Sequence, residues 1–197
     1  MIKNSLLLIL SFVLGSIPFG IIIAKIKGVD LKKVGSGNIG ATNVLRSLGK
    51  WPAVLTLLGD ILKGALAVTA GKYFGVEPVY EGLIGIFAIL GHNFSLFLRF
   101  RGGKGVATSL GVLIVYTPKV ALLTLIIWLV VVFFTKYSSM GAIVSFGLLP
   151  VNVMLFDPDD KTKLLIVILI SLFILIRHKD NIQRLIKGTE RRIGQRA

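Results

Sequence analysis

Long apolar runs divide this chain, and they constrain its fold more than any other feature of the sequence. A helix needs roughly 20 apolar residues to cross a bilayer, and the backbone groups of a segment in lipid must be paired within the protein. Hydrophobic residues make up 54% of the sequence, more than in an ordinary soluble domain. We place candidate spans at residues 5–26, 52–74, 80–98, 105–118, 119–135, 139–156 and 162–177. These runs predict a single all-α integral membrane domain over residues 1–197, with about seven transmembrane helices.

Two parts of this span assignment have alternatives. The first run follows Lys3, as the core of a signal peptide would, but it is longer than such a core and no clean cleavage site follows it. The fourth to sixth runs are joined by very tight connections, at Thr117-Pro118-Lys119 and at residues 136–139. Merging two of these runs would give six spans instead of seven.

The distribution of basic residues predicts the orientation in the membrane. The formal net charge is +14, and with seven spans 17 of the 23 Lys and Arg residues fall on one side. Basic loops stay in the cytoplasm, so this side is predicted to be cytoplasmic, with the N-terminus outside and the C-terminus inside. Six spans would put the basic first loop and the basic tail on opposite faces, and the charge bias argues against that.

Three polar segments of unusual composition lie on the predicted cytoplasmic side. They read GSGNIGATNVLR from Gly35, GHNFSLFLRFRGGKGVATS from Gly91 and RHKDNIQRLIKGTERRIG from Arg177. The first matches a dinucleotide-binding string, but membrane spans flank it in place of the required strand and helix. The second resembles a phosphate-binding loop, but Gly105 follows Lys104 where that motif needs Ser or Thr. We therefore reject both motifs.

The first two segments nevertheless keep the chemistry of anion-binding loops. Glycine lets backbone N–H groups approach a ligand, and free N–H groups attract phosphate oxygens. Neighbouring hydroxyl, amide and cationic side chains add hydrogen bonds and charge. The alternative is that the glycines form turns and the cations contact anionic lipid headgroups. Two such loops on one face favour anion binding, and we expect them to share one cleft at the inner leaflet.

The remaining ionisable residues have mainly structural interpretations. Asp60 and Lys63 lie near the middle of the second span and on one helix face. Such residues usually face a bundle interior, so they either line a polar cavity or, as we favour, form a structural ion pair that positions the first polar loop. His178 lies between two cations, which favours its neutral form. The spacing of the two histidines fits no metal site, and there is no cysteine.

The three polar segments closely resemble the signature segments of the PlsY family, the bacterial acyl-phosphate-dependent glycerol-3-phosphate acyltransferases. The resemblance extends to length, span number, segment order and the Asp60–Lys63 pair, so it covers nearly the whole chain. It implies a multi-pass enzyme of phospholipid synthesis in the cell membrane, with its active site facing the cytoplasm. Such an enzyme moves a fatty acyl group from acyl phosphate to the 1-hydroxyl of glycerol 3-phosphate, giving lysophosphatidic acid and phosphate. The implied partners are these substrates and membrane lipids, with no cofactor, no metal and no nucleic acid.

The resemblance also suggests roles for residues in the three segments. Acyl phosphate carries a good leaving group, so catalysis would consist mainly of positioning and charge stabilisation. The candidate catalytic residues are Ser36, Arg46 and His178, and the candidate substrate-binding residues are Gly37, Asn38, Gly40, Thr42, Asn43, His92, Arg101, Gly102, Gly103, Lys104, Gly105 and Asn181.

Two questions about the chemistry stay open at this point. The base for the hydroxyl proton is either a substrate phosphate oxygen or His178, and an acylated Ser36 is a less favoured third route. The His-x4-Asp motif of other glycerolipid acyltransferases is missing, because Phe97 and Gln183 stand five residues after the two histidines.

Two other classes of protein compete with the enzyme. A phosphate or lipid-phosphate transporter is disfavoured because the polar segments share one face and no inverted repeat is visible. A non-enzymatic lipid-binding scaffold leaves the hydroxyl and amide clusters unexplained.

Overall fold

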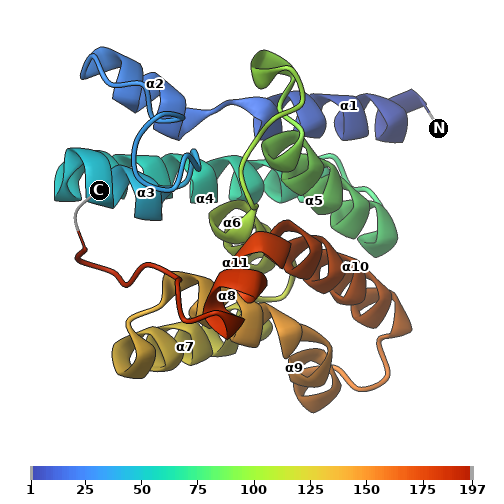
Figure 1. Ribbon diagram of the computed structural model, residues 1–197. Coiled ribbons are helices and arrows are strands. Elements are labelled where there is room, and N and C mark those ends of the chain that lie inside the picture. Colours follow the sequence, from blue (N-terminus) through green and yellow to red (C-terminus); the bar gives the residue numbers. More distant parts are fainter. Residues whose placement is uncertain (1, 196–197) are drawn as a thin grey trace.

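The computed structural model describes residues 2–195, and within them the only regular elements are helices (Figure 1). The predicted all-α class is therefore confirmed. In chain order the helices are α1 (Ile2–Ser16), α2 (Phe19–Ile26), α3 (Ala41–Leu48), α4 (Lys50–Tyr73), α5 (Pro78–Asn93), the 3-10 turn η1 (Leu96–Leu98), α6 (Val106–Tyr116), α7 (Pro118–Thr135), α8 (Ser138–Gly147), α9 (Leu149–Phe156), α10 (Lys161–Arg177) and α11 (Lys179–Ile186).

Several of these helices have the length and composition of a membrane span. Within the described part of the chain, the segments that qualify are Ile2–Ile26, Lys50–Tyr73, Pro78–Leu98 and Pro118–Thr135. The pair α8 and α9, bent by 44° at its break, gives a fifth if it crosses as one span. Helix α6 has 11 residues and α10 has 17, both short of the roughly 20 that a span needs. The count of seven spans and the sides of the termini therefore stay predictions.

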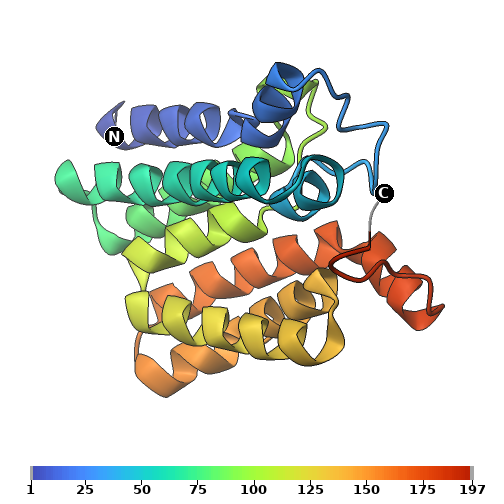
Figure 2. The same cartoon turned by 90° about the vertical axis from the view of Figure 1, so that its left-hand side faces the viewer.

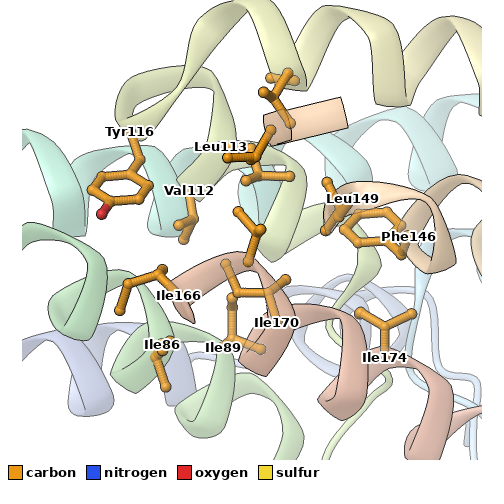
Figure 3. Packing of buried hydrophobic residues seen from close by; sticks show 14 of the residues in the cluster. Ile86, Ile89, Val112, Leu113, Tyr116, Phe146, Leu149, Ile166, Ile170 and Ile174 are labelled. Carbon is orange, nitrogen blue, oxygen red and sulfur yellow. The ribbon is translucent and has the colours of Figure 1, made fainter. Parts of the chain in front are cut away.

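The helices form two groups with α6 between them. Figures 1 and 2 show α1, α4 and α5 in one group and α7 to α10 in the other. The main core lies where the groups meet, and Figure 3 shows side chains of α5, α6 and α10 packed against one another. Its labelled members are Ile86, Ile89, Val112, Leu113, Tyr116, Phe146, Leu149, Ile166, Ile170 and Ile174.

Small residues allow the closest helix contacts. A side chain at Gly15 of α1 would overlap the backbone of Ala88 in α5, and one at Gly64 of α4 would overlap the backbone of Thr108 in α6. Lipid tails are as apolar as leucine, so helices in a bilayer associate through close packing and hydrogen bonds instead of the hydrophobic effect. These glycines let the backbones of the first group approach each other and α6.

A buried ion pair joins this packing to the polar segments. Lys63 Nζ lies 2.8 Å from Asp60 Oδ1, which confirms the predicted pair, and both side chains are almost fully buried. Lys63 also donates to the carbonyl of Ile17 at 2.8 Å. That carbonyl lies in the break between α1 and α2, where the ladder of helical hydrogen bonds is interrupted. His92 of α5 places its Nδ1 3.5 Å from Asp60 Oδ1, so one cluster ties α4 to α5 and to the α1–α2 break.

Candidate active site

The first polar segment is shaped by the buried side chain of Asn43, at the start of α3. Its Oδ1 accepts from the backbone N–H of Ser36 at 2.8 Å. Its Nδ2 donates to three backbone carbonyls, those of Leu31, Val34 and Asn38, at 3.3, 3.1 and 2.8 Å. These four hydrogen bonds hold the loop that carries Ser36, which has no regular secondary structure of its own. Asn43 therefore shapes this loop, and its predicted part in binding substrate stays a prediction.

The second polar segment folds back on the end of α5. The backbone N–H of Gly102 donates to the carbonyl of Asn93 at 3.1 Å, and that of Gly103 to the carbonyl of His92 at 3.0 Å. A side chain at either glycine would overlap His92 or Asn93. This corrects our expectation that these two N–H groups face an anion, because they cap the helix instead. The glycines are needed for close approach.

Arg177, at the end of α10, holds this loop from the other side. Its guanidinium donates to the carbonyl of Gly103 at 2.8 Å and 3.1 Å and to that of Gly102 at 3.3 Å. The same group lies over the ring of Phe94, 5.6 Å from its centre. The loop is therefore hydrogen-bonded to the end of α5 on one side and to Arg177 on the other, so the backbone that carries Lys104 is fixed.

Lys104 meets the third polar segment at Asn181 of α11. Its Nζ donates to Asn181 Oδ1, which leaves the amide nitrogen of Asn181 to donate elsewhere. Burial lowers the pKa of Lys104 to about 8, against the opposing effect of the nearby carboxylate of Glu190. Loop and helix are thus joined by one hydrogen bond between two of the predicted site residues.

His178 is held in one orientation just after α10. Its Nδ1 lies 2.7 Å from the carbonyl of Ile174. A carbonyl can only accept, so we infer that Nδ1 carries the proton and that Nε2 is left as an acceptor. Burial, and then the charge of Lys104, lowers the pKa of His178 to about 4. This shift agrees with the prediction of a neutral imidazole, with burial as the largest cause.

The carboxylate of Glu190 lies at the centre of a cluster formed by residues of the polar segments. Glu190 was not among the site residues predicted from the sequence. Its side chain is only 7% exposed. The carboxylate accepts from Asn181 Nδ2 at 2.8 Å, from Ser139 Oγ at 2.9 Å and from Arg184 Nε at 2.7 Å. Burial alone would raise the pKa of Glu190, but these hydrogen bonds outweigh it and hold the pKa below its ordinary value. The charges of Lys104 and Arg46 also interact with this carboxylate.

The chain after α11 ties the surrounding elements together. Arg46 of α3 donates to the carbonyl of Arg191 at 2.9 Å, and the backbone N–H of Ile193 donates to the carbonyl of Lys136 at 2.8 Å. At the start of α3, the hydroxyl of Thr42 lies 3.1 Å from that of Ser138. Figure 2 shows α3, α11 and this tail at one end of the bundle. The first, second and third polar segments therefore meet around Glu190.

The structure divides the predicted site residues into three sets. Brought together around Glu190 are Arg46, Lys104 and Asn181, with His178 beside them. Asn43 and Asn38 shape the first loop, and Asn38 Oδ1 accepts from the N–H of Gly40 at 3.0 Å. Ser36 is exposed on that loop.

Two predicted residues lie outside the cluster. His92 is buried beneath the second loop, against Asp60 and Gly103, where it supports the loop. Arg101 lines a separate cavity with Lys32 and Phe97.

Glu190→Ala is expected to lower the free energy of unfolding by about 2 kcal/mol, because three buried or half-buried donors lose their acceptor. Acyltransfer activity should fall as well, since Asn181 and Arg184 lose the group that orients them. Thermal unfolding and initial rates in detergent measure both effects. Glu77→Ala, at an exposed glutamate before α5, is the matched control. Equal unfolding temperatures for the two variants would show that Glu190 does not hold the cluster together.

The fold and the cluster together define a helical membrane protein with one cationic and amide-rich site at the end of its bundle. The family described as glycerol-3-phosphate acyltransferase matches residues 5–188. The chain belongs to this family, and it is an enzyme: a membrane-embedded acyltransferase of phospholipid synthesis. This membership confirms the resemblance seen in the sequence and excludes the transporter and the scaffold.

Relatives and solved structures agree along almost the whole chain. A glycerol-3-phosphate acyltransferase of Thermus thermophilus is 46% identical over 190 residues, covering 96% of this chain and 95% of the relative. That of Carboxydothermus hydrogenoformans is 44% identical over 191 residues, covering 95% of each. The crystal structure of PlsY, an integral membrane glycerol 3-phosphate acyltransferase, in its glycerol 3-phosphate form matches with a TM-score of 0.92 at 41% identity, covering 98% of this chain and 96% of that one.

Proposed function

We propose that this enzyme transfers a fatty acyl group from acyl phosphate to the 1-hydroxyl of glycerol 3-phosphate at the cluster around Glu190. One observation carries the proposal: three segments far apart in sequence bring Arg46, Lys104 and Asn181 around a single carboxylate. Cations and amide donors are the groups that bind phosphate oxygens. The solved PlsY structures in glycerol 3-phosphate and lysophosphatidic acid forms support these as substrate and product.

The reaction needs little chemistry from the protein. The hydroxyl oxygen bonds to the acyl carbon, the bond from that carbon to the phosphate oxygen breaks, and the electron pair leaves with the phosphate. Lys104 and Arg46 would stabilise the charge that grows on the leaving phosphate, as preorganised donors do in other acyl transfers. Asn181 would orient the acceptor end of glycerol 3-phosphate.

The position of His178 favours a substrate-assisted proton transfer. With a pKa near 4, its imidazole is a weak base at neutral pH, although its free Nε2 can accept a hydrogen bond from a hydroxyl. A phosphate monoester has a second pKa of about 6, so a substrate phosphate oxygen is the better base. The hydroxyl proton would therefore leave with the phosphate. Since 17 of the 23 basic residues share one side, that side and this site would face the cytoplasm.

Donor specificity tests the proposal directly. Purified protein is given labelled glycerol 3-phosphate with either palmitoyl phosphate or palmitoyl-CoA, and lysophosphatidic acid and released phosphate are counted. Equal amounts of both products from the acyl phosphate, and none from the thioester, are expected. Comparable rates with the thioester would refute acyl phosphate as the dedicated donor.

His178→Ala separates the possible bases. A loss of about tenfold in kcat supports the phosphate oxygen, because removal of a general base typically costs 10²–10⁴-fold. A larger loss assigns the proton to His178. A trapped acyl ester on Ser36 would support covalent catalysis instead.

The value of kcat/KM should fall as the pH rises above about 8. As the pH rises through the pKa of Lys104, the ammonium loses its proton and with it the charge that binds phosphate. The acid side reports the substrate phosphate, not His178, whose pKa lies near 4. Lys104→Arg should move the alkaline limb to above about pH 10, because a guanidinium keeps its charge there. An alkaline limb that stays near pH 8 in this variant would assign it to another group.

A further inference from the structure

A second cationic cavity lies on the segment that joins α5 to the Gly102–Gly105 loop. It has a volume of about 470 Å³ and is lined by Lys32, Phe97, Leu98, Arg99 and Arg101. We call it the Arg99–Arg101 cavity. Leu98 packs against the buried cluster that contains Ala24 of α2 and Leu31. None of the five lining residues belongs to the cluster around Glu190, so the two sites are distinct.

The three cations of this cavity have no internal counter-charge. Among residues 2–195, no hydrogen bond or ion pair joins the side chain of Lys32, Arg99 or Arg101 to another group, and no carboxylate lines the cavity. The cations around Glu190, by contrast, share its carboxylate. All three side chains are exposed, so solvent screens their mutual repulsion, and an anion placed among them would interact favourably with each. The charge pattern thus suits an external anion.

The backbone beside this cavity is strained. Arg99 and Phe100 have φ angles of +52° and +59°, a left-handed conformation that costs a non-glycine residue roughly 1–2 kcal/mol. Consecutive residues of this kind persist only where the surroundings impose them, and they concentrate at functional sites. The turn leaves Phe97 and Phe100 about 60% exposed, beside the two arginines.

The depth of this segment in the bilayer indicates the source of the anion. Helix α5 and η1 form one candidate span that ends at Leu98, so Arg99 and Arg101 follow directly at the level of the headgroups. Exposed aromatic rings at that level anchor a protein in the membrane interface, and neighbouring cations bind lipid phosphates. A soluble anion would make no use of Phe97 and Phe100.

We propose that the Arg99–Arg101 cavity binds the phosphate headgroup of an anionic phospholipid from the surrounding bilayer. The lipid phosphate would lie among the three cations, and its acyl chains would run along the exposed rings into the membrane. The inference does not depend on the acyl donor or on the proton acceptor proposed above.

Lipid binding to the delipidated protein in detergent, followed by native mass spectrometry without substrates, tests this proposal. The probes are phosphatidylglycerol, phosphatidylcholine and inorganic phosphate. The principal variant is Arg99→Asn with Arg101→Gln, since asparagine tolerates the left-handed conformation at position 99. Lys32→Gln, on a different loop, keeps the test valid if the double variant misfolds. Lys27→Gln with Lys50→Gln removes two exposed cations that do not line the cavity and is the matched control.

Affinity for phosphatidylglycerol should fall at least about tenfold in the Arg99–Arg101 double variant and about fivefold in Lys32→Gln. The control should stay within about twofold of the unaltered protein, and phosphatidylcholine should bind more weakly than phosphatidylglycerol throughout. The proposal is overturned if the control loses as much affinity as the double variant, or if both lipids bind equally. Displacement of phosphatidylglycerol by millimolar inorganic phosphate would overturn it too, because the site would then belong to a soluble anion.

Discussion

Lys104→Met is expected to lower kcat/KM for glycerol 3-phosphate by 10²- to 10³-fold, the cost that follows the loss of one preorganised donor to a developing negative charge. The structure fixes the position of Lys104 through its loop and through its ammonium group. The N–H groups of Gly102 and Gly103 in its loop donate hydrogen bonds to the end of α5, and Arg177 donates to the carbonyl groups of the same loop. Its ammonium is then aimed at Asn181. A charge held in this way needs no reorganisation when the phosphate leaves.

Steady-state rates over a range of both substrates check this prediction. Lys179→Met, at an exposed lysine that begins α11, removes the same charge from the same end of the molecule and should change kcat/KM less than about threefold. The unfolding temperatures of both variants should match that of the unaltered protein. A loss below tenfold for Lys104→Met, with the fold intact, would remove Lys104 from the catalytic machinery.

The second large effect is expected at the buried ion pair. Asp60→Asn leaves the ammonium of Lys63 in the bundle without its counter-charge, 1% exposed. Breaking a buried pair by removing one partner costs roughly 3–5 kcal/mol, because the remaining charge is uncompensated. Asp60→Asn with Lys63→Met removes both charges and should recover most of that stability. Replacing both residues of the pair is therefore expected to lower the free energy of unfolding only slightly, whereas removing one partner should lower it strongly.

Unfolding in detergent, followed for the two single variants and the double variant, gives the coupling energy. Lys72→Met is the control, since its ion pair with Glu81 at 3.9 Å and its exposed hydrogen bond to the carbonyl of Val115 at 2.7 Å are together worth about 1–2 kcal/mol. A double variant as unstable as Asp60→Asn would mean that the cost comes from lost packing around α4 and not from an unpaired charge.

Much of the site could be predicted from sequence because its residues stand in three polar segments between apolar runs. Arg46 and Lys104 could be chosen for their charge, whereas His178 and Asn181 could be chosen with the help of the family resemblance, and the structure brings all four together. Asn43, Gly102 and Gly103 could be located, but not the backbone groups to which they are hydrogen-bonded. Whether an amide or an N–H group is free for a ligand depends on which backbone groups lie next to it.

Other features had no signal in the sequence. Ser139 lies in the first turn of α8, in no recognisable motif, and it reaches Glu190 across 51 positions. Arg101 and Lys104 are three residues apart and chemically similar, yet they line different sites. The left-handed turn at Arg99 and Phe100 comes just before Arg101, and composition does not reveal it.

The amino-acid sequence by itself determined that this chain is a helical membrane protein with glycine, amide and basic residues gathered in three polar segments, because the spacing of apolar and polar residues is a local property. Only the tertiary structure decided that Glu190 joins those segments, that His92 supports a loop and that Arg101 lines its own cavity. Those outcomes depend on distances between residues far apart in the chain, and such distances are set by how α4, α5, α6 and α10 pack.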